Sequence, residues 1–404
     1  MSPPNAPAAP SPDPYAGLPA GTFAIAAQER IVHGRPAAAV LRDEVERVGA
    51  RRAFVVTGRS LGTLADGPVQ RIEAALAGRH AGTWAAVRAH SPREDVVAAA
   101  SAARAAGADL VVAVGGGSAI DAAKGVLLCL WHGLTSPDEL EPFRSGAASA
   151  RAIEPPPGAP ALVAVSTTLS AAEFTGMAGI TDARTMAKQA YVHRLLVPRV
   201  AVLDPGATLH TPLPLLFATA IRSVDHAVEC WCSPQATPAT EMLSLHGLRL
   251  LAQALPAIQR EPQALAPRLQ AQFGMWQAIA ALAAGVQTGA SHGIGYALGA
   301  GFGVAHGHTS CVLLPAVLQW NEAVNGARQR ALSEALGDAS RPAHELLRAL
   351  VRQLGQPSTL REVGLREDQL DELAQRALAY PPVAANPRPL PDAAAVRQIL
   401  ALAW

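Results

Sequence analysis

The sequence predicts an α/β first half with a doubly wound, mostly parallel sheet, followed by an all-α second half. Short runs rich in β-branched residues alternate with Ala-rich helical runs up to about residue 203, which is the pattern of βαβ units. After Asp204-Pro205 the strand-like runs stop and helical patterns take over. A chain of 404 residues is too long for one ordinary core, so two domains are expected.

Strands and helices alternate regularly through the first half. The run at 109–114 is almost entirely apolar, as expected for a strand that is covered on both faces. Ser91-Pro92 precedes an Ala-rich run, and proline in the first turn is typical of a helix start, which predicts a helix at 93–106. The remaining predicted elements are strands at 23–25, 30–32, 53–57, 82–87, 161–166 and 199–203 and helices at 36–48, 69–76 and 119–131.

The second half is expected to contain mainly helices. Proline or glycine separates most of its helical runs, which predicts helix ends at those points. The expected helices are 214–233, 237–255, 264–284, 291–298, 310–323, 327–336, 342–354, 359–363 and 366–379. We assign residues 1–18, rich in proline and alanine, to a disordered tail. Residues 19–205 then form the α/β domain and residues 206–404 the helical domain, with a ligand expected between them.

Charge balance and cysteine content exclude several classes of protein. Lys and Arg total 33 against 32 Asp and Glu, so neither nucleic acid nor an anionic membrane is an expected partner. We find no uninterrupted apolar run of about 18 residues, and the N-terminus lacks the basic and apolar regions of a signal peptide. The four cysteines form no C-x-x-C pair, which favours reduced thiols and a cytoplasmic protein.

A phosphate-binding turn is predicted directly after the strand at 109–114. Gly115, Gly116 and Gly117 are followed by Ser118 and then by the expected helix. Glycines let the backbone come close to an anion, and the N–H groups and dipole of a helix start favour negative charge. The turn has neither the G-x-G-x-x-G spacing of the usual dinucleotide fingerprint nor the G-K-[ST] of a Walker loop. The residues alone therefore indicate a phosphate group and leave its molecule open.

Several segments, in the same order along the chain, resemble the iron-containing (group III) alcohol dehydrogenase family. The turn region 114–124 is similar to the family's glycine signature, and 165–173 is similar to its P-T-T-x-x-T-G-S-E segment. The other matching segments are Asp204-Pro205 with Thr208 and Pro212, His226-Ala227-Val228-Glu229, His306-Gly307, and Asn386-Pro387-Arg388-Pro389. Together they cover roughly residues 22 to 404.

The resemblance implies a dehydroquinate synthase-like architecture and an NAD(P)-dependent oxidoreductase that forms a homodimer. Hydride would pass between nicotinamide on the α/β domain and a carbonyl or alcohol group held against the helical domain. Carried over to this sequence, the cofactor-binding residues are Gly115, Gly116, Gly117, Ser118, Asp121, Thr167, Thr168 and Lys188. The first four meet the pyrophosphate, Asp121 supports the turn, and the last three lie along the ribose and nicotinamide. Lys188 also fits a solvated surface lysine.

The adenosine end of the cofactor site departs from the family pattern. Many relatives carry Asp after the strand at 53–57, where it repels a 2′-phosphate, whereas this chain has Gly58-Arg59-Ser60. A guanidinium at this point would pair with the 2′-phosphate of NADP. A surface arginine without a ligand fits the same position, so both NAD and NADP stay open.

The resemblance also implies a divalent metal held by one Asp and three His. His226, His292 and His306 match the histidines, and such a set suits Fe²⁺ or Zn²⁺ with one position open for a substrate oxygen. The carboxylate is missing, because the position four residues before the first histidine holds Arg222. Asp225 points about 100° away from His226 on a helix and is a poor substitute.

Two interpretations follow from Arg222. In one, a weakened three-histidine metal site persists with the arginine turned away. In the other, which we favour, no metal binds, because a guanidinium beside a dication is electrostatically costly. Arg222 then anchors a substrate carboxylate or stabilises an oxyanion, and Tyr296 or a histidine supplies the proton. The predicted catalytic residues are Arg222, His226, His292, Tyr296 and His306.

The predicted function is hydride transfer between nicotinamide and the carbonyl or alcohol group of a small substrate. The maleylacetate reductase branch of the family also lacks the Asp ligand, so an oxo acid such as maleylacetate is one expected substrate. One alternative is a metal-dependent alcohol or aldehyde dehydrogenase of the same family. The other is a nucleotide-binding relative without catalysis, which would bind the cofactor and turn over no carbonyl compound.

Overall fold

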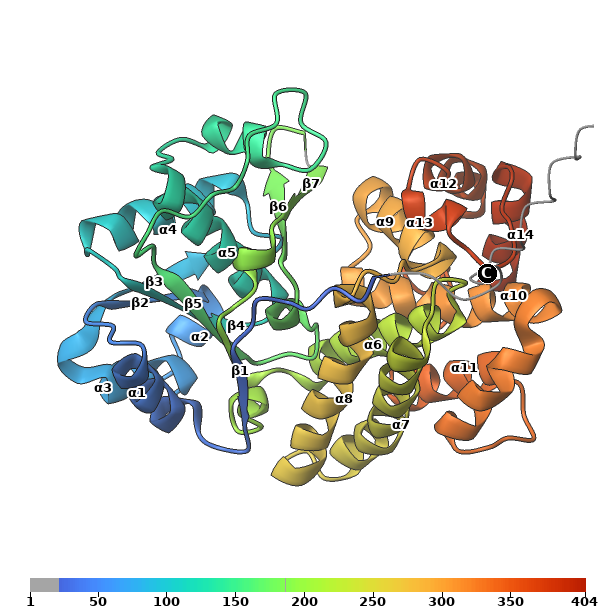
Figure 1. Ribbon diagram of the computed structural model, residues 1–404. Helices are drawn as coiled ribbons and strands as arrows, with labels where there is room; N and C mark the ends of the chain where they lie inside the picture. Colours follow the sequence, from blue (N-terminus) through green and yellow to red (C-terminus); the bar gives the residue numbers. More distant parts are fainter. Residues whose placement is uncertain (1–21, 186) are drawn as a thin grey trace, which may run out of the picture.

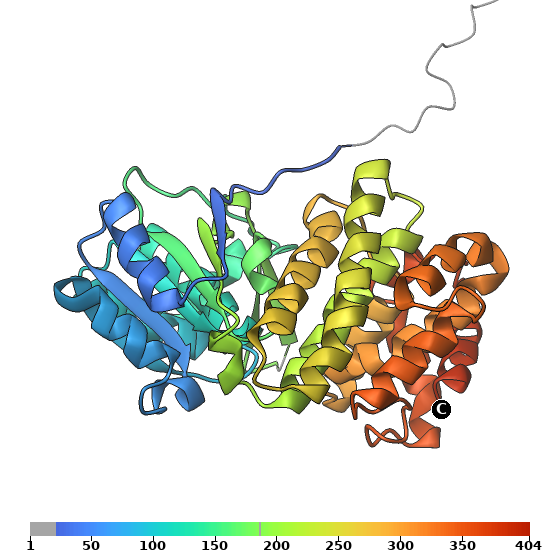
Figure 2. The ribbon, with the colours of Figure 1, turned by 90° about the horizontal axis from the view of Figure 1, so that it is seen from below.

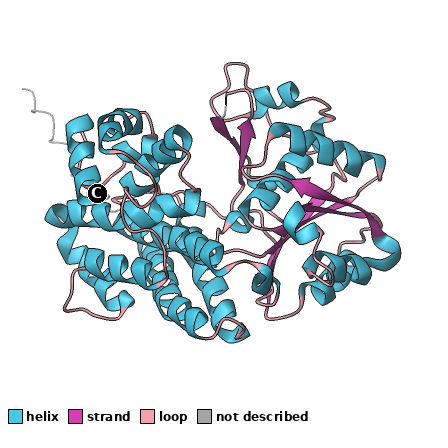
Figure 3. Ribbon diagram, turned by 180° about the vertical axis from the view of Figure 1, so that it is seen from behind, coloured by secondary structure: helices cyan, strands magenta, loops and turns pink. Residues whose placement is uncertain are grey.

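The computed structural model describes residues 22–185 and 187–404, so the predicted tail at 1–18 lies outside the described residues. An α/β half and a helical half lie side by side (Figure 1), and all the strands drawn belong to the first half (Figure 3). The predicted fold class, a doubly wound parallel sheet followed by an all-α part, is confirmed. A domain boundary at residue 205 stays a prediction.

Six parallel strands form the sheet in the order β1-β8-β5-β4-β2-β3. Their bounds are β1 Arg30–His33, β2 Ala53–Gly58, β3 His80–Val87, β4 Leu110–Gly115, β5 Ala161–Ser166 and β8 Val200–Leu203. The chain passes from β2 outward to β3 and then crosses to the other side of β2 to form β4. The carboxyl ends of β2 and β4 therefore meet at a topological switch point, where open α/β sheets bind their ligands.

Helices cover both faces of this sheet. On one face lie α1 (Ala37–Arg47) and α3 (Pro68–Leu76), and on the other lie α4 (Arg93–Ala105) and α5 (Gly117–His132). All six residues of β4 are buried, because the strand is central and covered on both sides. This double cover explains its apolar sequence.

An antiparallel hairpin, which was not predicted, follows the fifth strand of the sheet. β6 (Met177–Asp182) pairs with β7 (Ala187–Val192), and β6 packs against α5. In β7 only Tyr191 is buried, so no apolar run marks this strand in the sequence. The hairpin carries Lys188 toward α5.

The helical half starts after β8. No strand occurs in residues 204–404, all of which the structure describes, and no helix among the described residues is long and apolar enough to cross a membrane. α7 and α8 run side by side next to α6 (Figure 2). The helices are α6 Leu213–Cys232, α7 Pro238–Arg260, α8 Leu265–Ala283, α9 Ala290–Phe302, α10 His306–Leu336, α11 Ala343–Gln353, α12 Leu370–Ala377, α13 Pro381–Ala384 and α14 Ala393–Leu402.

Four predicted elements differ from the structure. Residues 23–25 form no strand, and Ala24 N donates instead to Ala284 O of the helical half. The helices predicted at 310–323 and 327–336 are one helix, α10, kinked at Asn325. Residues 359–363 form a turn rather than a helix, because the chain leaves the helical conformation at Gly364, which has a φ of 85°.

Hydrogen bonds join the loop after β5 to the helical half. Leu169 N donates to Thr219 Oγ1 at 3.1 Å, and Ser223 Oγ donates to Leu169 O at 2.7 Å. Thr211 Oγ1 donates to Thr167 O at 2.7 Å. These bonds fix α6 against the carboxyl end of the sheet. Residues of α6 and residues of the loop after β5 therefore lie close together.

Candidate active site

The glycine turn lies at the switch point of the sheet. Gly115 ends β4 with a φ of 149°, a conformation that favours glycine. α5 begins at Gly117 with Gly116 as N-cap, and no side chain caps it. Its first N–H groups are therefore available to an anion, and the helix dipole adds to the attraction.

The loop after β5 lies directly against this turn. A Cβ on Gly116 would lie 2.7 Å from Thr168 Cγ2, so no side chain fits at this position. Thr168 Oγ1 and Ser170 Oγ are hydrogen bonded at 3.1 Å, and Thr167 N donates to Gly115 O at 3.0 Å. The structure thus brings Thr167 and Thr168 beside the predicted pyrophosphate site.

A loop before α4 holds Ser118 from the other side. His90 and Ser91 both have positive φ, 64° and 52°, which costs roughly 1–3 kcal/mol each outside glycine and concentrates at ligand-binding sites. His90 N donates to Ser118 Oγ at 3.0 Å, and Ser91 Oγ donates to Ser118 O at 2.8 Å. The sequence analysis missed both residues, because their types do not reveal the backbone conformation.

Asp121 contacts the hairpin rather than the glycine turn. Its Oδ2 accepts a hydrogen bond from Gly179 N at 3.1 Å and lies 3.8 Å from Lys188 Nζ. The Lys188 side chain is about half exposed, and its methylene groups lie over Gly179, where a Cβ would meet Lys188 Cε at 2.1 Å. Asp121 therefore fixes the position of Lys188 above α5.

Glu173, at the end of the loop after β5, is a fully buried carboxyl group. Neither of its oxygens has a hydrogen-bond partner among the described residues, and burial raises its pKa from 4.5 to about 7. The folded protein therefore binds more protons at this residue than the unfolded chain between pH 4.5 and about 7. The free energy of unfolding consequently falls as the pH rises through that window.

Replacing Glu173 with glutamine is expected to raise the free energy of unfolding at pH 8 by about 2–3 kcal/mol, since a neutral amide avoids the cost of the buried charge. At pH 4.5, where the native carboxyl is protonated, the variant and the parent should be nearly equal. Urea denaturation across this pH range measures the difference. The exposed Glu154→Gln is the control, and a stability difference that does not change with pH would contradict the explanation.

One face of α6 is polar and buried. Arg222, Asp225, His226 and Glu229 stand at i, i+3, i+4 and i+7, which places them on one helical face, and none is more than 6% exposed. A stripe that faces a core is normally apolar, because buried polar groups are costly without partners. The polar stripe therefore indicates a functional site.

Ser310 of α10 connects Arg222 to Asp225. Arg222 Nη1 donates to Ser310 Oγ at 2.9 Å, and Ser310 Oγ donates to Asp225 Oδ2 at 2.6 Å. The guanidinium nitrogen also lies 3.5 Å from the same carboxylate oxygen. Burial raises the pKa of Asp225, but His292, Arg222 and Ser310 outweigh burial, and the pKa lies below its ordinary value. An ionised Asp225 thus balances the buried arginine.

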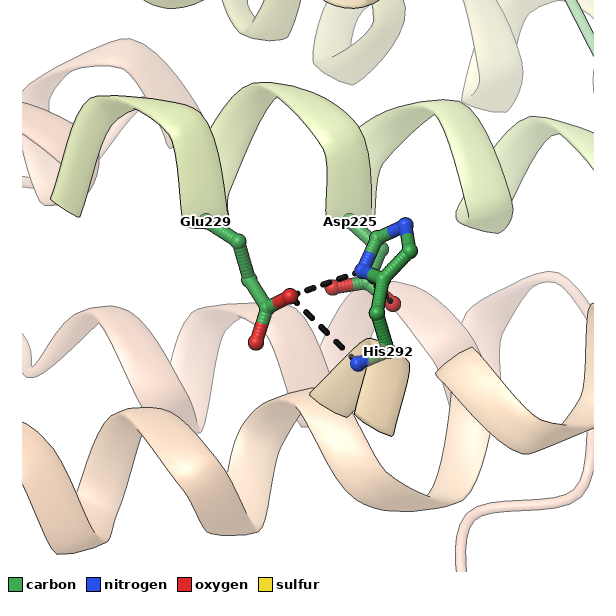
Figure 4. Close-up of side chains that lie close together, drawn as sticks. All are labelled: Asp225, Glu229 and His292. Carbon is green, nitrogen blue, oxygen red and sulfur yellow. Dashed lines mark hydrogen bonds and ion pairs between the residues drawn. The ribbon is translucent and has the colours of Figure 1, made fainter. Parts of the chain in front are cut away.

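α9 places His292 against the same face. His292 Nδ1 lies 2.7 Å from Glu229 Oε2 and 3.5 Å from Asp225 Oδ2 (Figure 4). Its ring centre is 5.0 Å from that of His226. Burial and Arg222 lower the pKa of His292, but the two carboxylates raise it more, so it lies above the ordinary value.

Tyr296 and His306 complete the group. Their rings stack with centres 6.1 Å apart, and Arg222 Cζ lies 5.6 Å from the centre of the Tyr296 ring. His306 reaches this position because α10 starts in direct contact with α6: a Cβ on Gly307 would lie 2.8 Å from Ala218 backbone atoms. The charge of Arg222 lowers the pKa of His306 well below its ordinary value.

Within this group, burial is greatest at two histidines and decreases toward the predicted cofactor-binding residues. His226 and His292 are buried, Tyr296 is half-buried, and His306 and Lys188 are exposed. Burial, with the charges of His292 and Arg222, keeps the pKa of His226 well below its ordinary value. Arg222 and, more weakly, Lys188 lower the pKa of His306, so the two halves of the predicted site lie within electrostatic reach of each other.

The side chains present do not fit the four-ligand metal site that the resemblance implies. Within the described residues, the only group of three or more His, Cys, Asp or Glu side chains whose donor atoms all lie within 4.8 Å of one another is Asp225, Glu229 and His292. His226 and His306 are outside this set, and a guanidinium stands where a carboxylate ligand is needed. His226 Nδ1 and His292 Nε2 are nevertheless buried and have no hydrogen-bond partner in the described part of the chain. Such nitrogens are suited to hydrogen-bond a polar group of a bound molecule.

The sequence analysis gave no role to several residues of this group. Glu229 was noted only as part of a motif, although its helical spacing of three from His226 places it on the same face. Ser310 and Tyr380 lie far from α6 in the sequence and left no signal. The Tyr380 ring centre lies 5.9 Å from that of Tyr296, so Tyr380 borders the open side of the group.

Two family profiles match the chain over most of its length. The profile of the iron-containing alcohol dehydrogenases matches residues 28–205, and the C-terminal profile of the Fe-containing alcohol dehydrogenase family matches residues 217–404. The chain belongs to the iron-containing alcohol dehydrogenase family. It is therefore an oxidoreductase that uses NAD(P), as predicted.

Similar proteins include the maleylacetate reductases. The maleylacetate reductase of Pseudomonas sp. (strain P51) is 29% identical over 363 residues, which cover 89% of this chain and 92% of that protein. Dehydrogenase ALT3 of Alternaria alternata is 32% identical over 366 residues, covering 82% and 93% of the two chains. The solved structure of the maleylacetate reductase from Agrobacterium tumefaciens superimposes on this chain with a TM-score of 0.79 at 27% sequence identity. The match covers 95% of this chain and 97% of that chain. The predicted maleylacetate reductase-like branch is confirmed.

Proposed function

We propose that this protein reduces the carbonyl group of a small oxo acid with NAD(P)H and needs no bound metal. The observation that carries the proposal is the buried Arg222, which Ser310 and Asp225 hold among the predicted catalytic residues. Maleylacetate, after which several relatives are named, is the first substrate to test.

The nicotinamide cofactor supplies a hydride when it is bound, and the residues of this chain do the rest. Gly115, Gly116, Gly117 and Ser118 hold the pyrophosphate. Arg222 stabilises the negative charge that develops on the carbonyl oxygen, and its charge can also bind a substrate carboxylate. Tyr296 or a histidine supplies the proton that forms the alcohol.

Oxidation of NADH and NADPH in the presence of maleylacetate, 2-oxo acids and aldehydes without a carboxylate tests this proposal. We expect kcat/KM for the best oxo acid to exceed that for the matching aldehyde by at least about tenfold, because a charge-assisted bond to Arg222 is lost in the aldehyde. Preference for plain aldehydes, or cofactor binding without turnover of any carbonyl compound, would contradict it.

A metal-dependent alcohol dehydrogenase is the second candidate function. The three histidines are retained on helices that pack together, and both His226 and His292 carry a buried nitrogen that no described residue hydrogen-bonds. This reading requires Arg222 to turn away from its Ser310 and Asp225 contacts. Metal analysis separates the two functions.

Arg59, at the start of the short helix α2 (Arg59–Gly62), is proposed to contact the 2′-phosphate of NADP. It is exposed, follows β2 at the switch point, and belongs to a helix whose Leu61 would lie 3.7 Å from a Cβ on Gly115. Arg59→Asp is expected to lower kcat/KM with NADPH by at least about tenfold, because the new carboxylate repels the phosphate. With NADH the change should stay within about twofold. Equal effects on both cofactors would contradict the assignment.

We also propose that the protein is a cytoplasmic homodimer. All four cysteines are buried free thiols, which fits a reducing compartment, and the family resemblance supports a dimer. Analytical ultracentrifugation and cell fractionation test the two points separately.

A further inference from the structure

Glu229 connects the polar face of α6 to the start of α9. Its Oε2 accepts hydrogen bonds from Gly289 N at 2.8 Å and His292 N at 3.4 Å, and its Oε1 accepts one from Ser291 N at 2.7 Å. α9 begins after Gly289, which has no capping side chain. The Glu229 carboxylate therefore satisfies the free N–H groups of this helix and faces the positive end of its dipole.

The same carboxylate holds the His292 ring. Glu229 Oε2 lies 2.7 Å from His292 Nδ1, as Figure 4 shows. A carboxylate that accepts hydrogen bonds from three backbone N–H groups acts as an ionised acceptor. The proton of its fourth contact, between Glu229 Oε2 and His292 Nδ1, therefore belongs to Nδ1. Since the bond made by one ring nitrogen determines the state of the other, Nε2 is left for a different partner.

His292 Nε2 has no hydrogen-bond partner within residues 22–185 and 187–404. It is buried and unpaired among the described residues, at the end of the ring that points away from Glu229 in Figure 4. The His292 ring lies 5.0 Å from that of His226 and 6.2 Å from that of Tyr296, measured between centres. The free nitrogen thus belongs to the group of predicted catalytic residues.

Asp225 lies on the same side of the ring as Glu229. Its Oδ2 is 3.5 Å from His292 Nδ1 and accepts hydrogen bonds from Ser291 Oγ at 2.8 Å and Ser310 Oγ at 2.6 Å. These two hydroxyl groups keep the carboxylate in place. Negative charge therefore surrounds Nδ1 and not Nε2.

We propose that Glu229 is a positioning residue that fixes His292 as the Nδ1–H tautomer, so that the Nε2 lone pair faces the reacting oxygen of the substrate and accepts the hydrogen bond of its alcohol form. The directing role rests on the proposed function, whereas the tautomer itself does not. Capping of α9 alone would not require the bond to the ring. Removing a carboxylate that positions a metal-ligating histidine typically costs about 10- to 100-fold in metal affinity or activity, and we expect a loss of the same order for a histidine that contacts the substrate.

Nitrogen-15 NMR of protein labelled at histidine tests the tautomer without any turnover. The His292 resonances are identified by their loss in His292→Gln. We expect the protonated nitrogen of His292 to be Nδ1, with its proton far downfield because the acceptor is charged. A His292 that carries its only ring proton on Nε2 in the unaltered protein would overturn the proposal, whether or not any variant folds.

Glu229→Gln tests the positioning role. An amide keeps one acceptor oxygen and adds a donor, so it cannot satisfy all four N–H groups. We expect the Nδ1–H signal to move upfield and kcat to fall by about 10- to 100-fold, with KM for the cofactor within about twofold. Asn386→Ala is the matched control, because Asn386 Oδ1 accepts a hydrogen bond from Ala290 N at 3.3 Å at the same helix end, and the Asn386 side chain makes its other hydrogen bonds within the described residues to Asn321 and Arg388 rather than to His292. We expect this control to leave the His292 resonances in place.

The NMR and kinetic results together separate the positioning role of Glu229 from the proposed part of His292 in the reaction. Equal losses of kcat in Glu229→Gln and Asn386→Ala, with unchanged His292 resonances, would show a structural cap only and overturn the positioning role. A shifted Nδ1–H signal with unchanged kcat would leave the tautomer standing and overturn the proposed part of His292 in the reaction.

Discussion

Replacing Arg222 with methionine is expected to lower kcat for carbonyl reduction by about 100- to 1000-fold, the usual effect of removing one group that stabilises an oxyanion. The proposed cofactor contacts lie on the sheet side of the site, so the dissociation constant for NAD(P)H should change by less than about threefold. Stopped-flow reduction assays and cofactor fluorescence titration measure the two quantities. A variant that keeps its kcat would exclude Arg222 from the chemistry.

The Arg222→Met variant needs a control, because it leaves the charge of the Asp225 carboxylate without its partner. Asp225 is fully buried and 3.5 Å from Arg222, and removing one partner of a buried ion pair typically costs about 3–5 kcal/mol. The double variant Arg222→Met with Asp225→Asn removes both charges and should recover much of that stability. If the double variant regained activity with its stability, the loss in the single variant would be a folding effect.

Gly116→Ala is expected to raise the dissociation constant for NAD(P)H by about 100-fold or more, since a displacement of about 1 Å at a binding site can have effects of this size. The added methyl group would lie 2.7 Å from Thr168 Cγ2, so either the start of α5 or the loop after β5 must move. In both cases the N–H groups of the turn would lose their alignment with the pyrophosphate that we propose to bind there. Isothermal titration calorimetry measures the affinity.

Gly78→Ala is the matched control for the glycine turn. Nothing lies within 4 Å of a Cβ at Gly78, so this change adds the same methyl group without a steric conflict. Its cofactor affinity should equal that of the parent within about twofold. Unchanged affinity in Gly116→Ala would move the pyrophosphate away from this turn.

The sheet and the glycine turn could be predicted because their causes are local in the sequence. A strand covered on both faces must be apolar along its whole length, as β4 is. The turn after it is marked by three consecutive glycines, which the sequence shows directly, although the close approach of Thr168 to Gly116 is visible only in the structure. The hairpin β6–β7 escaped prediction for the opposite reason, since β7 is largely exposed and has no regular alternation of apolar residues.

The arrangement of the predicted catalytic residues depends on contacts between segments that are far apart in the sequence. The sequence placed Asp225 as a poor metal ligand beside His226, and it could not show that Ser310 joins the Asp225 carboxylate to Arg222. Glu229 could have been identified from its helical spacing, but its bonds to the start of α9 could not. Packing through glycine at Gly307, against Ala218, brings these helices close enough for such contacts.

Metal content and activity measured on the same purified protein test most directly whether Arg222 stands in place of a metal. After treatment with a chelator, the unaltered protein is expected to contain well below one metal ion per chain and to keep its full kcat. Arg222→Asp, which restores a carboxylate four residues before His226, is expected to bind up to roughly one Fe²⁺ or Zn²⁺ per chain. Loss of activity on chelation, with recovery on adding Fe²⁺ or Zn²⁺ to the unaltered protein, would contradict the metal-free assignment.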